Sequence, residues 1–389
     1  MTTRSLWLNR TSFFAAIAAL AFGVGACETD TAEAPEADTG TETTAVDEGV
    51  DEGATQEEFD ITLNGAGASF PAPLYQSWFS QLPEEYPGLQ VNYQSVGSGS
   101  GIEQYLAGTV DFGASDAPLT DEERQSFVDE YGMDPIQVPM TGGLVVFAYN
   151  LPEVEGELRL TQDAYCGIVT GEITQWDAEP IASANPDLTL PSSNINFVHR
   201  SDGSGTTFLF TNHLNEVCEG WEGGAAKTVD WPVGVGARGN EGIAAQVQQN
   251  EGSIGYVEYT YSSENDIPSA TLENTSGNFI EPSPEAAAIA FDDVEVPEDF
   301  ALLIPEPDGE DAYPIVGLTW LLIYPEYDDE EIARAIQTTI DWAVTEGDEY
   351  ATELGYIPLP DGVADRVQTT VEDAVSVAGA EDSNSVAFR

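Results

Sequence analysis

The sequence predicts an α/β fold in which strands alternate with helices and the sheets are largely parallel. From Asp60 onward, short apolar runs of strand length recur and amphipathic segments separate them. Three of these strands lead directly into a Gly/Ser-rich loop and then a helical segment. Two further runs, Gly143 to Tyr149 and Ile315 to Tyr324, are too short to span a bilayer and are typical of buried strands. Such alternation is the pattern of α/β domains.

The first elements of the folded region follow this alternation. A strand is expected at Phe59 to Leu63. A helix is expected at Pro71 to Leu82, because proline suits the first turn of a helix. Its apolar face would consist of Leu74, Tyr75, Trp78 and Phe79. A strand, a short helix and a strand are then predicted at Val91 to Tyr93, Ile102 to Leu106 and Val110 to Gly113.

The later elements continue the pattern. Gly143 to Tyr149 is a strand, Asn194 to Val198 another, and Gly205 to Asn215 a helix. After the apolar strand at Ile315 to Tyr324, the segment Ile332 to Thr345 has the period of an amphipathic helix. We find no internal repeat in the sequence.

The charge balance is extreme. Asp and Glu number 70 against 10 Lys and Arg, the formal net charge is −60, and Lys227 is the single lysine. This charge argues against nucleic acid and anionic membrane surfaces as partners. The acids also cover segments rich in aromatic and branched residues, which predicts a folded acidic surface. Such a surface suits molar salt, where the Debye length is about 3 Å, and the sequence therefore predicts a halophilic protein.

The N-terminus predicts export and lipid attachment. Arg4 and Arg10 precede an apolar run from Phe13 to Ala26, which ends at Cys27. Small residues before a cysteine resemble a bacterial lipobox, so residues 1–26 are expected to be a lipoprotein signal peptide and Cys27 the lipidated N-terminus. Residues 27–59 are acidic and poor in apolar bulk, which predicts a disordered tether. An ordinary signal peptide with an incidental cysteine is the alternative.

Cysteine and histidine are scarce in the rest of the chain. An exported protein lies in an oxidising compartment, so Cys166 and Cys218 are a possible disulfide pair, which the sequence alone leaves open. With only His199 and His213 and no C-x-x-C motif, no metal site and no cofactor are expected.

Three Gly/Ser-rich loops are the candidate sites of the chemistry. They lie in ITLNGAGASFPAP (61–73), VNYQSVGSGSGIEQ (91–104) and INFVHRSDGSGTTFLF (195–210), each between a strand and a helix. Helix N-termini offer unpaired N–H groups and partial positive charge, glycine permits close approach, and hydroxyls add donors. Arg200 can add a bidentate, charge-assisted contact. The loops therefore predict an oxyanion site.

Motifs for other chemistry are absent or weak. VGVGARG (233–239) fits G-x-G-x-x-G, but Trp231 and Pro232 precede it, so a Rossmann strand is doubtful. The sequence has no phosphate loop with a lysine and no G-x-S-x-G elbow. Two histidines leave few bases for a catalytic triad. We therefore predict a binding protein and not an enzyme.

At the same loops the sequence resembles the phosphate-binding proteins of phosphate-specific ABC transporters. The resemblance covers nearly all of residues 61–365. It rests on four blocks in order: GAGASFPAPLY, VNYQSVGSGSGIEQYLAGTVDFGASDAPLTDEE, LPSSNINFVHRSDGSGTTFLFTNHL and GNEGIAAQVQQNEGSIGYVEYTY. The resemblance implies high-affinity binding of inorganic phosphate and its delivery to a membrane permease, by a monomer that is periplasmic or on the cell surface.

The resemblance also implies the ligand residues. By position, phosphate would be bound by Ser69, Phe70, Ser98, Asp116, Arg200, Ser204, Gly205 and Thr206, with Asp202 orienting Arg200. Ser69 stands where the family commonly has threonine. The second block reads GSGSG where GSSGG is typical, which keeps Ser98 but leaves the roles of the next residues open.

The family fold is a two-domain clamp of the type II periplasmic-binding-protein class, with two hinge strands and the ligand in the cleft. The resemblance implies one discontinuous lobe at 60–148 plus 314–389 and a second lobe at 149–313, which would close on the ligand. Asp116 would accept the proton that phosphate carries and sulfate lacks. The alternatives are a binder of another tetrahedral oxyanion, an extracytoplasmic phosphatase on this fold, and a purely structural surface lipoprotein.

Overall fold

An eight-stranded mixed sheet organises the computed structural model, which describes residues 58–292 and 294–377. The predicted signal peptide, Cys27 and nearly all of the tether lie outside the described residues. The strand order is β2-β1-β3-β11-β4-β8-β6-β7. Their bounds are β1 Ile61–Gly67, β2 Leu89–Ser95, β3 Phe112–Ser115, β4 Ile136–Tyr149, β6 Asn196–Arg200, β7 Val235–Ala237, β8 Ser253–Glu258 and β11 Val316–Ile323.

The sheet has two halves, which belong to two lobes joined by β4 and β11. Strand β4 pairs with β11 over Ile136 to Leu144 and with β8 over Val145 to Tyr149, so it passes from one lobe into the other. The pairs β1–β2, β1–β3, β6–β7 and β6–β8 are parallel. Strand β11 is antiparallel to both β3 and β4, and β4 is antiparallel to β8. The prediction of largely parallel sheets therefore holds in the two halves and is wrong for the connecting strands.

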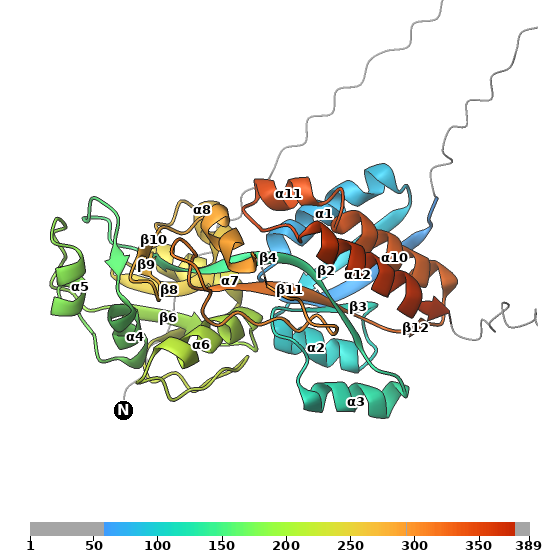
Figure 1. Cartoon of the computed structure of the whole chain (residues 1–389), viewed down its shortest axis with the longest axis horizontal. Coiled ribbons are helices and arrows are strands. Elements are labelled where there is room, and N and C mark those ends of the chain that lie inside the picture. The colour runs from blue at the N-terminus through green and yellow to red at the C-terminus, as the bar shows by residue number, and fades with distance from the viewer. Residues whose placement is uncertain (1–57, 293, 378–389) are drawn as a thin grey trace, which may run out of the picture. The chain divides into compact units, whose positions relative to one another are not determined.

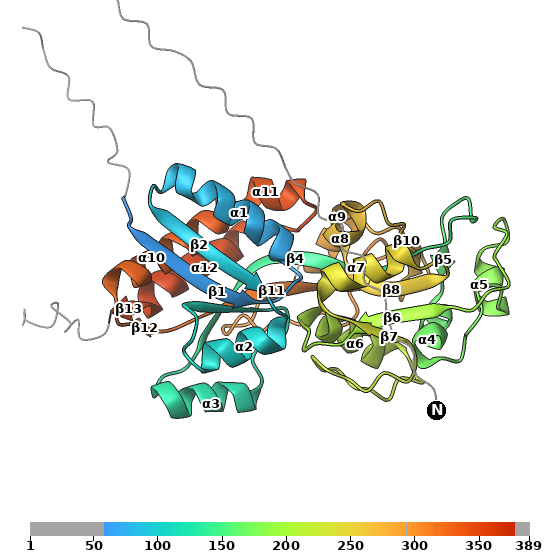
Figure 2. The same cartoon turned by 180° about the vertical axis from the view of Figure 1, so that it is seen from behind.

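Lobe 1 has helices on both sides of its half of the sheet. Helices α1, α10, α11 and α12 gather on one side and α2 and α3 on the other (Figures 1 and 2). Lobe 1 contains α1 Ala72–Glu85, α2 Ser98–Leu106, α3 Asp121–Tyr131, α10 Glu330–Ala343, α11 Asp348–Glu353 and α12 Asp361–Ala374, with a small sheet of β12 Glu326–Tyr327 and β13 Ser376–Val377. The apolar face of α1 is buried as predicted, except that Phe79 is only partly covered.

Lobe 2 repeats this layering. Helices α7, α8 and α9 lie on one side of its half-sheet and α4 and α6 on the other (Figure 2). Its further elements are α4 Gln162–Thr170, α5 Glu179–Ala184, α6 Gly205–Val217, α7 Gly239–Gln249, α8 Tyr259–Ser263, α9 Pro284–Ala288, a 3-10 turn at Ile289–Phe291, and a small sheet of β5 Arg159–Leu160, β9 Thr271–Glu273 and β10 Phe279–Ile280.

Two predicted elements are longer than the sequence indicated. Strand β4 begins at Ile136 and not at Gly143, although it contains Pro139, which donates no backbone hydrogen bond. Its register against β11 shifts there: Thr319 pairs with Thr141 and Trp320 with Pro139, which leaves Met140 as the additional residue of a bulge. The bulge accommodates the proline within the strand.

Helix α2 starts at Ser98, four residues before its predicted start at Ile102. The composition GSGSG is typical of a loop, but packing makes this segment helical. A Cβ added to Gly101 would lie 2.4 Å from the Cα of Gly67, so only glycine allows α2 to approach β1 so closely. The backbone N–H of Gly99 also donates to the carbonyl of Gly203 at 3.0 Å. The first turn of α2 thus contacts both β1 and the opposite lobe.

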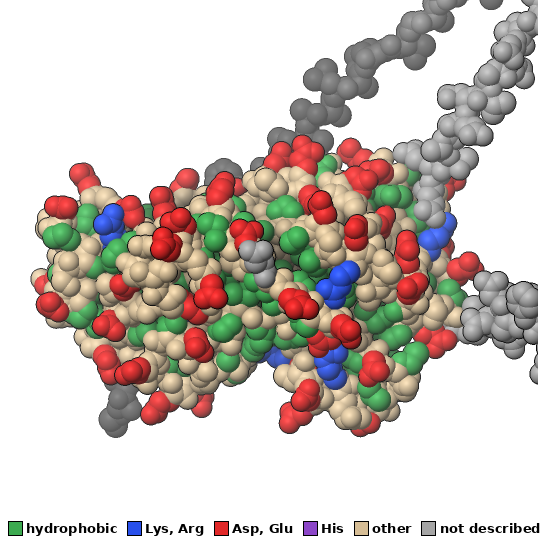
Figure 3. Space-filling model, viewed as in Figure 1, with side chains coloured by type: hydrophobic (Ala, Val, Ile, Leu, Met, Phe, Trp, Pro, Cys, Tyr) green, Lys and Arg blue, Asp and Glu red, His purple; other side chains and the backbone are tan. Residues whose placement is uncertain are grey.

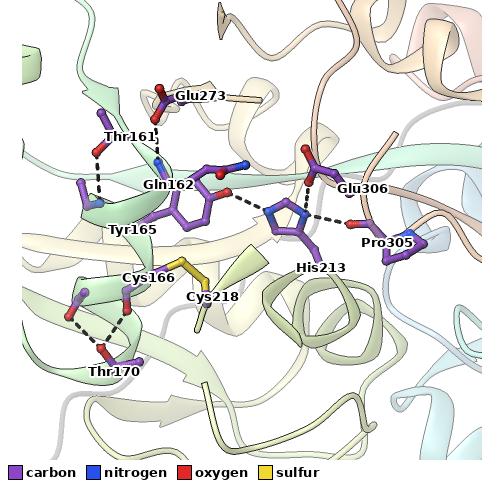
Figure 4. Close-up of a disulfide and its surroundings, with 12 residues drawn as sticks. Thr161, Gln162, Tyr165, Cys166, Thr170, His213, Cys218, Glu273, Pro305 and Glu306 are labelled. Atoms are coloured by element: carbon purple, nitrogen blue, oxygen red, sulfur yellow. Dashed lines mark hydrogen bonds and ion pairs between the residues drawn. A yellow bond between two sulfur atoms is a disulfide. The ribbon is translucent and has the colours of Figure 1, made fainter. Parts of the chain in front are cut away.

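A disulfide joins α4 to the end of α6 in lobe 2. Cys166 and Cys218 are bonded, with their Cα atoms 5.6 Å apart (Figure 4). Beside them, the buried His213 ring contacts the hydroxyl of Tyr165 and the carbonyl of Pro305, both at 2.9 Å. His213 thus connects α6 to its neighbours inside the lobe.

Acidic side chains are scattered over the whole surface seen in Figure 3, where lysine and arginine side chains are few. The acids lie over elements of both lobes, on a protein with a continuous buried core. The acidic residues therefore belong in large part to folded segments.

Candidate functional site

Four helix N-termini meet where the two lobes touch. Helices α1, α2, α6 and α7 each follow the carboxyl end of a parallel strand, namely β1, β2, β6 and β7. The Ser98 hydroxyl of α2 accepts a hydrogen bond from the Gly205 N–H of α6 at 2.9 Å. The Ser69 hydroxyl before α1 accepts from the Asn240 N–H of α7 at 3.1 Å. In α/β sheets the crevice at the carboxyl ends of the strands is the usual ligand site.

These helix starts carry positive electrostatic potential. Helices α1, α2 and α7 have no N-cap side chain that bonds their first turn. The first two N–H groups of α7 donate instead to Asp202 Oδ1 at 3.2 Å and to Ser69 Oγ at 3.1 Å. Each helix also contributes partial positive charge at its N-terminus. In α6 the Ser204 hydroxyl accepts from the N–H of Thr207 at 3.0 Å and caps the helix. The convergence of four such termini favours an anion between them.

Three hydroxyls in this region are restricted to donating. A hydroxyl has one hydrogen to donate and two lone pairs to accept with. Ser69 Oγ accepts from the N and Nδ2 of Asn240, at 3.1 and 3.0 Å. Thr206 Oγ1 accepts from Asn240 Nδ2 at 3.0 Å and Arg200 Nη1 at 3.4 Å.

The Ser98 hydroxyl follows the same rule. Ser98 Oγ accepts from the backbone N–H of Gly205 at 2.9 Å and of Asp116 at 3.3 Å. Both lone pairs of each hydroxyl are therefore occupied, and the O–H hydrogen is its remaining hydrogen-bonding capacity. An anion between the lobes can use these donors. The Ser98 O–H also lies within reach of the Asp116 carboxylate, whose pKa burial raises against the lowering effect of a hydrogen bond from Ser98.

Arg200 is a buried and rigidly held cation. Its Nε and Nη2 donate to the two carboxylate oxygens of Asp202 at 2.8 and 2.6 Å, and its side chain is 1% exposed. Burial by itself lowers the pKa of Arg200, but the hydrogen bonds and the charge of Asp202 outweigh it, so that this pKa is raised. Burial raises the pKa of Asp202, and the hydrogen bonds and charge of Arg200 outweigh it, so that this pKa is lowered. Both groups are therefore charged, and the two hydrogen bonds to Asp202 fix the position of the Arg200 guanidinium.

Asp116 is a buried acidic residue of the site. It follows β3, is 1% exposed, and accepts a hydrogen bond from Thr319 Oγ1 at 2.9 Å. Burial raises the pKa of Asp116 to about 7, against the opposing effects of the Thr319 hydrogen bond and the Arg200 charge. A Cβ added to Gly205 would lie 2.6 Å from this carboxylate, so glycine is needed where α6 approaches it.

Comparisons with known proteins show the family of this chain. Residues 30–346 match the model of the PBP superfamily domain. Phosphate-binding protein PstS of Pasteurella multocida is 40% identical over 312 residues, which cover 79% of this chain and 89% of the relative. The PstS of Methanocaldococcus jannaschii is 35% identical over 328 residues, covering 78% and 84%. The chain belongs to the PstS family.

Solved structures show the same two-lobed fold as this PstS-family chain. A high-affinity periplasmic phosphate-binding protein, PfluDING, bound with phosphate, superimposes with a TM-score of 0.68 at 23% identity, covering 82% of this chain and 96% of that one. A phosphate-binding protein from Stenotrophomonas maltophilia gives a TM-score of 0.64 at 21% identity, covering 79% and 93%. At such identities the likeness supports the fold alone.

The structure brings the predicted residues of this PstS-family chain together, in different ways. The contacts above link six of these residues, namely Ser69, Ser98, Asp116, Arg200, Gly205 and Thr206. The Phe70 ring is buried against Tyr356, and its carbonyl accepts from the Tyr356 hydroxyl at 2.7 Å. Asp202 reaches the site through Arg200, and Ser204 lies at the cap of α6.

Sequence reasoning missed two residues of the site. Asn240, in the first turn of α7, contacts Ser69 and Thr206, and Thr319 on β11 contacts Asp116. The signal for Asn240 was present, because its helix follows VGVGARG and forms a fourth strand–loop–helix unit. Thr319 lies inside an apolar strand, and nothing in the sequence indicated it.

The single lysine of the chain also connects the lobes. Lys227 Nζ donates to both carboxylate oxygens of Glu123 on α3, at 2.7 and 2.9 Å. The Lys227 carbonyl accepts from the N–H of Ser204 at 2.9 Å, which ties this loop to the start of α6. The pair lines a groove of about 460 Å³ between the lobes. A second cavity, of about 250 Å³, is lined by Arg200, Asp202 and residues 227–231.

The described residues offer neither a metal-binding cluster nor a membrane-spanning helix. In ranges 58–292 and 294–377, no group of three or more His, Cys, Asp or Glu side chains is placed to hold a metal ion. Over the same ranges, no helix combines the length and apolar character that crossing a membrane requires.

Proposed function

We propose that this protein binds inorganic phosphate between its two lobes, outside the cytoplasm, and delivers it to the permease of an ABC importer. One observation carries the proposal: three hydroxyls restricted to donating and a buried guanidinium lie in the same region as the buried carboxyl of Asp116. The donors suit oxyanion oxygens, and the carboxylate suits the proton of a partly protonated oxyanion. The PstS relatives at about 40% identity support phosphate as the ligand.

In this proposal each lobe contributes part of the phosphate-binding residues. Lobe 1 would comprise residues 60–148 plus 314–389, and lobe 2 residues 149–313. From lobe 1, phosphate would be contacted by Ser69, Ser98 and Asp116. From lobe 2, it would be contacted by Arg200, Gly205 and Thr206. Further contacts would come from Phe70 and Ser204 in their loops. Because each lobe makes only some of the contacts to phosphate, bound phosphate stabilises the closed form of the clamp relative to the open form. The crossing of β4 and β11 between the lobes supports these strands as the hinge.

A calorimetric titration tests the function. At about pH 8, inorganic phosphate added in molar salt should bind at one site per monomer, and sulfate should give no saturable heat. Arsenate is a tetrahedral oxyanion that also carries protons, so arsenate binding distinguishes a general oxyanion binder from a phosphate-selective one. Trp231 lines the cavity beside Arg200, so its fluorescence should report the same titration. An absence of both signals with phosphate rejects the proposal, and hydrolysis of a phosphate monoester would favour a phosphatase instead.

We also propose adaptation to high salt. A net charge of −60 repels an anionic ligand, and repulsion among the acidic side chains destabilises the folded state unless salt ions screen these charges. The same titration in dilute buffer should show weaker phosphate binding and a lower melting temperature. Unchanged binding by a well-folded sample in dilute buffer would reject salt adaptation and leave the phosphate proposal intact.

Export and membrane attachment complete the proposal. Residues 1–26 would be removed as a signal peptide, Cys27 would carry lipid, and residues 27–59 would tether the monomer to the membrane. The motif ending in Val24-Gly25-Ala26-Cys27 supports this. Cys27→Ser should release the protein from the membrane fraction of expressing cells. Retention of the variant on membranes would contradict lipid attachment.

A further inference from the structure

Asn240 is a buried amide at the contact between the lobes. It is the second residue of α7 and is 0% exposed. Its Nδ2 donates to Ser69 Oγ and to Thr206 Oγ1, both at 3.0 Å. Its Oδ1 accepts from the backbone N–H of Glu258 at 3.1 Å, and its own N–H donates to Ser69 Oγ at 3.1 Å. The amide group thus has a partner for both hydrogens of Nδ2 and for Oδ1.

The orientation of this amide is fixed by its surroundings. A backbone N–H can only donate, so the atom of Asn240 that faces the N–H of Glu258 must be the oxygen. The opposite atom, which faces the two hydroxyls, is therefore the NH₂ group. Because an NH₂ group can only donate here, Ser69 and Thr206 must accept from it. This assignment follows from hydrogen-bonding capacity alone.

We propose that Asn240 is a positioning residue that compels the hydroxyls of Ser69 and Thr206 to donate to the anion held between the lobes. This inference rests on the proposed function. Asn240 occupies lone pairs on both hydroxyls, so each hydroxyl offers the ligand a hydrogen and not an acceptor. Without Asn240, each hydroxyl could turn its hydrogen toward protein groups and present a lone pair to the ligand. Preorganised donors strengthen anion binding because no reorientation is required.

The inference also links donor orientation to closure of the clamp. Ser69 belongs to lobe 1, whereas Asn240 and Thr206 belong to lobe 2. Asn240 can restrict Ser69 only when the lobes meet. The full donor set is therefore assembled in the closed form, together with the contact between Ser98 and Gly205.

The substitution Asn240→Asp tests the inference with little change in shape. A carboxylate still accepts from the N–H of Glu258, but the atom facing Ser69 and Thr206 becomes an acceptor. Both hydroxyls should then donate to residue 240 and withdraw their hydrogens from the ligand. We expect affinity for inorganic phosphate, measured by calorimetry in molar salt, to fall by roughly 10³-fold. Asn250→Asp, exposed at the end of the same helix, adds the same charge and should bind as the wild type does.

A double-mutant cycle separates this role from a merely structural one. Ser69→Ala should lower phosphate affinity roughly tenfold or more in the wild type. In the Asn240→Asp background it should have almost no further effect, because the Ser69 hydroxyl no longer serves the ligand. Where circular dichroism shows that Asn240→Asp is unfolded, Asn240→Ala takes its place in the cycle, with the same expectation of non-additivity.

The outcomes are distinct from those of the proposed function. If wild-type protein does not bind phosphate, the proposed function fails. If the wild type binds and folded Asn240→Asp binds within about threefold of it, the positioning role of Asn240 is overturned and the proposed function stands. Additive effects of Ser69→Ala and the residue 240 variant would likewise overturn it.

Discussion

Replacing Arg200 by methionine is expected to lower phosphate affinity by roughly 10²- to 10³-fold, because loss of one partner from a buried charged contact costs about 2 to 5 kcal/mol. Arg200 is 1% exposed, and Asp202 holds its guanidinium through two hydrogen bonds. Methionine approximates the length of the side chain and removes the charge and the donors. Asp202 would remain as a carboxylate with a donor at the Gly239 N–H, and would repel the anion. Calorimetry with phosphate in molar salt measures the effect.

Arg159→Met is the matched control for this variant. Arg159 lies in the same lobe, its side chain is 51% exposed, and it pairs with Glu157 at 3.8 Å. The substitution removes one positive charge, as Arg200→Met does, and should leave phosphate affinity within about twofold of the wild type, since exposed ion pairs contribute little. Equal losses in both variants would mean that overall charge, and not the contacts of Arg200, governs binding.

Replacing Asp116 by asparagine is expected to weaken discrimination between phosphate and sulfate. The carboxylate can accept a proton from phosphate, whereas sulfate has none to offer and meets a like charge. An amide can present its NH₂ group to sulfate instead. We expect sulfate to compete roughly 10²-fold more strongly in the variant than in the wild type, since a charged hydrogen bond contributes about 1.5 to 3 kcal/mol. Displacement of labelled phosphate by sulfate measures this competition.

The pH dependence of sulfate competition provides an independent check on Asp116. Burial raises the pKa of this carboxyl to about 7, so the group is protonated below that pH and ionised above it. The protonated form can donate to sulfate, and the ionised form repels it. In the wild type, sulfate competition should therefore weaken as the pH rises from about 6 to about 8, whereas the asparagine variant should show no such change. If sulfate competes no more strongly with the asparagine variant than with the wild type at about pH 8, the proposed role of Asp116 is refuted.

How much of the site could be predicted depended on where each residue lies in the chain. Ser69, Ser98 and Arg200 lie in or beside Gly/Ser loops between a strand and a helix, and such loops are visible in the sequence. Thr319 lies on β11 among apolar neighbours, where a threonine is an ordinary strand residue. The Thr319 hydroxyl reaches Asp116 only because β11 pairs antiparallel with β3, the strand that Asp116 follows. Contacts across a sheet between distant segments leave no local pattern.

The start of α2 shows the same limit on the scale of one helix. Gly97 to Gly101 read as a loop, because glycine and serine are poor helix formers. The segment becomes helical because Gly101 packs on β1 and Gly99 bonds to Gly203 of the other lobe. Tertiary contacts thus outweighed local propensity at this helix start.

The sequence by itself determined the alternation of strands and helices, the acidic composition and the three Gly/Ser loops that contain Ser69, Ser98 and Arg200, because periodicity, composition and local motifs are properties of neighbouring residues. The tertiary structure decided the antiparallel connection through β4 and β11 and the meeting of four helix N-termini. It also decided the roles of Asn240 and Thr319. The physical reason is that these features depend on contacts between segments far apart in the chain, which exist only after both lobes have packed along one sheet.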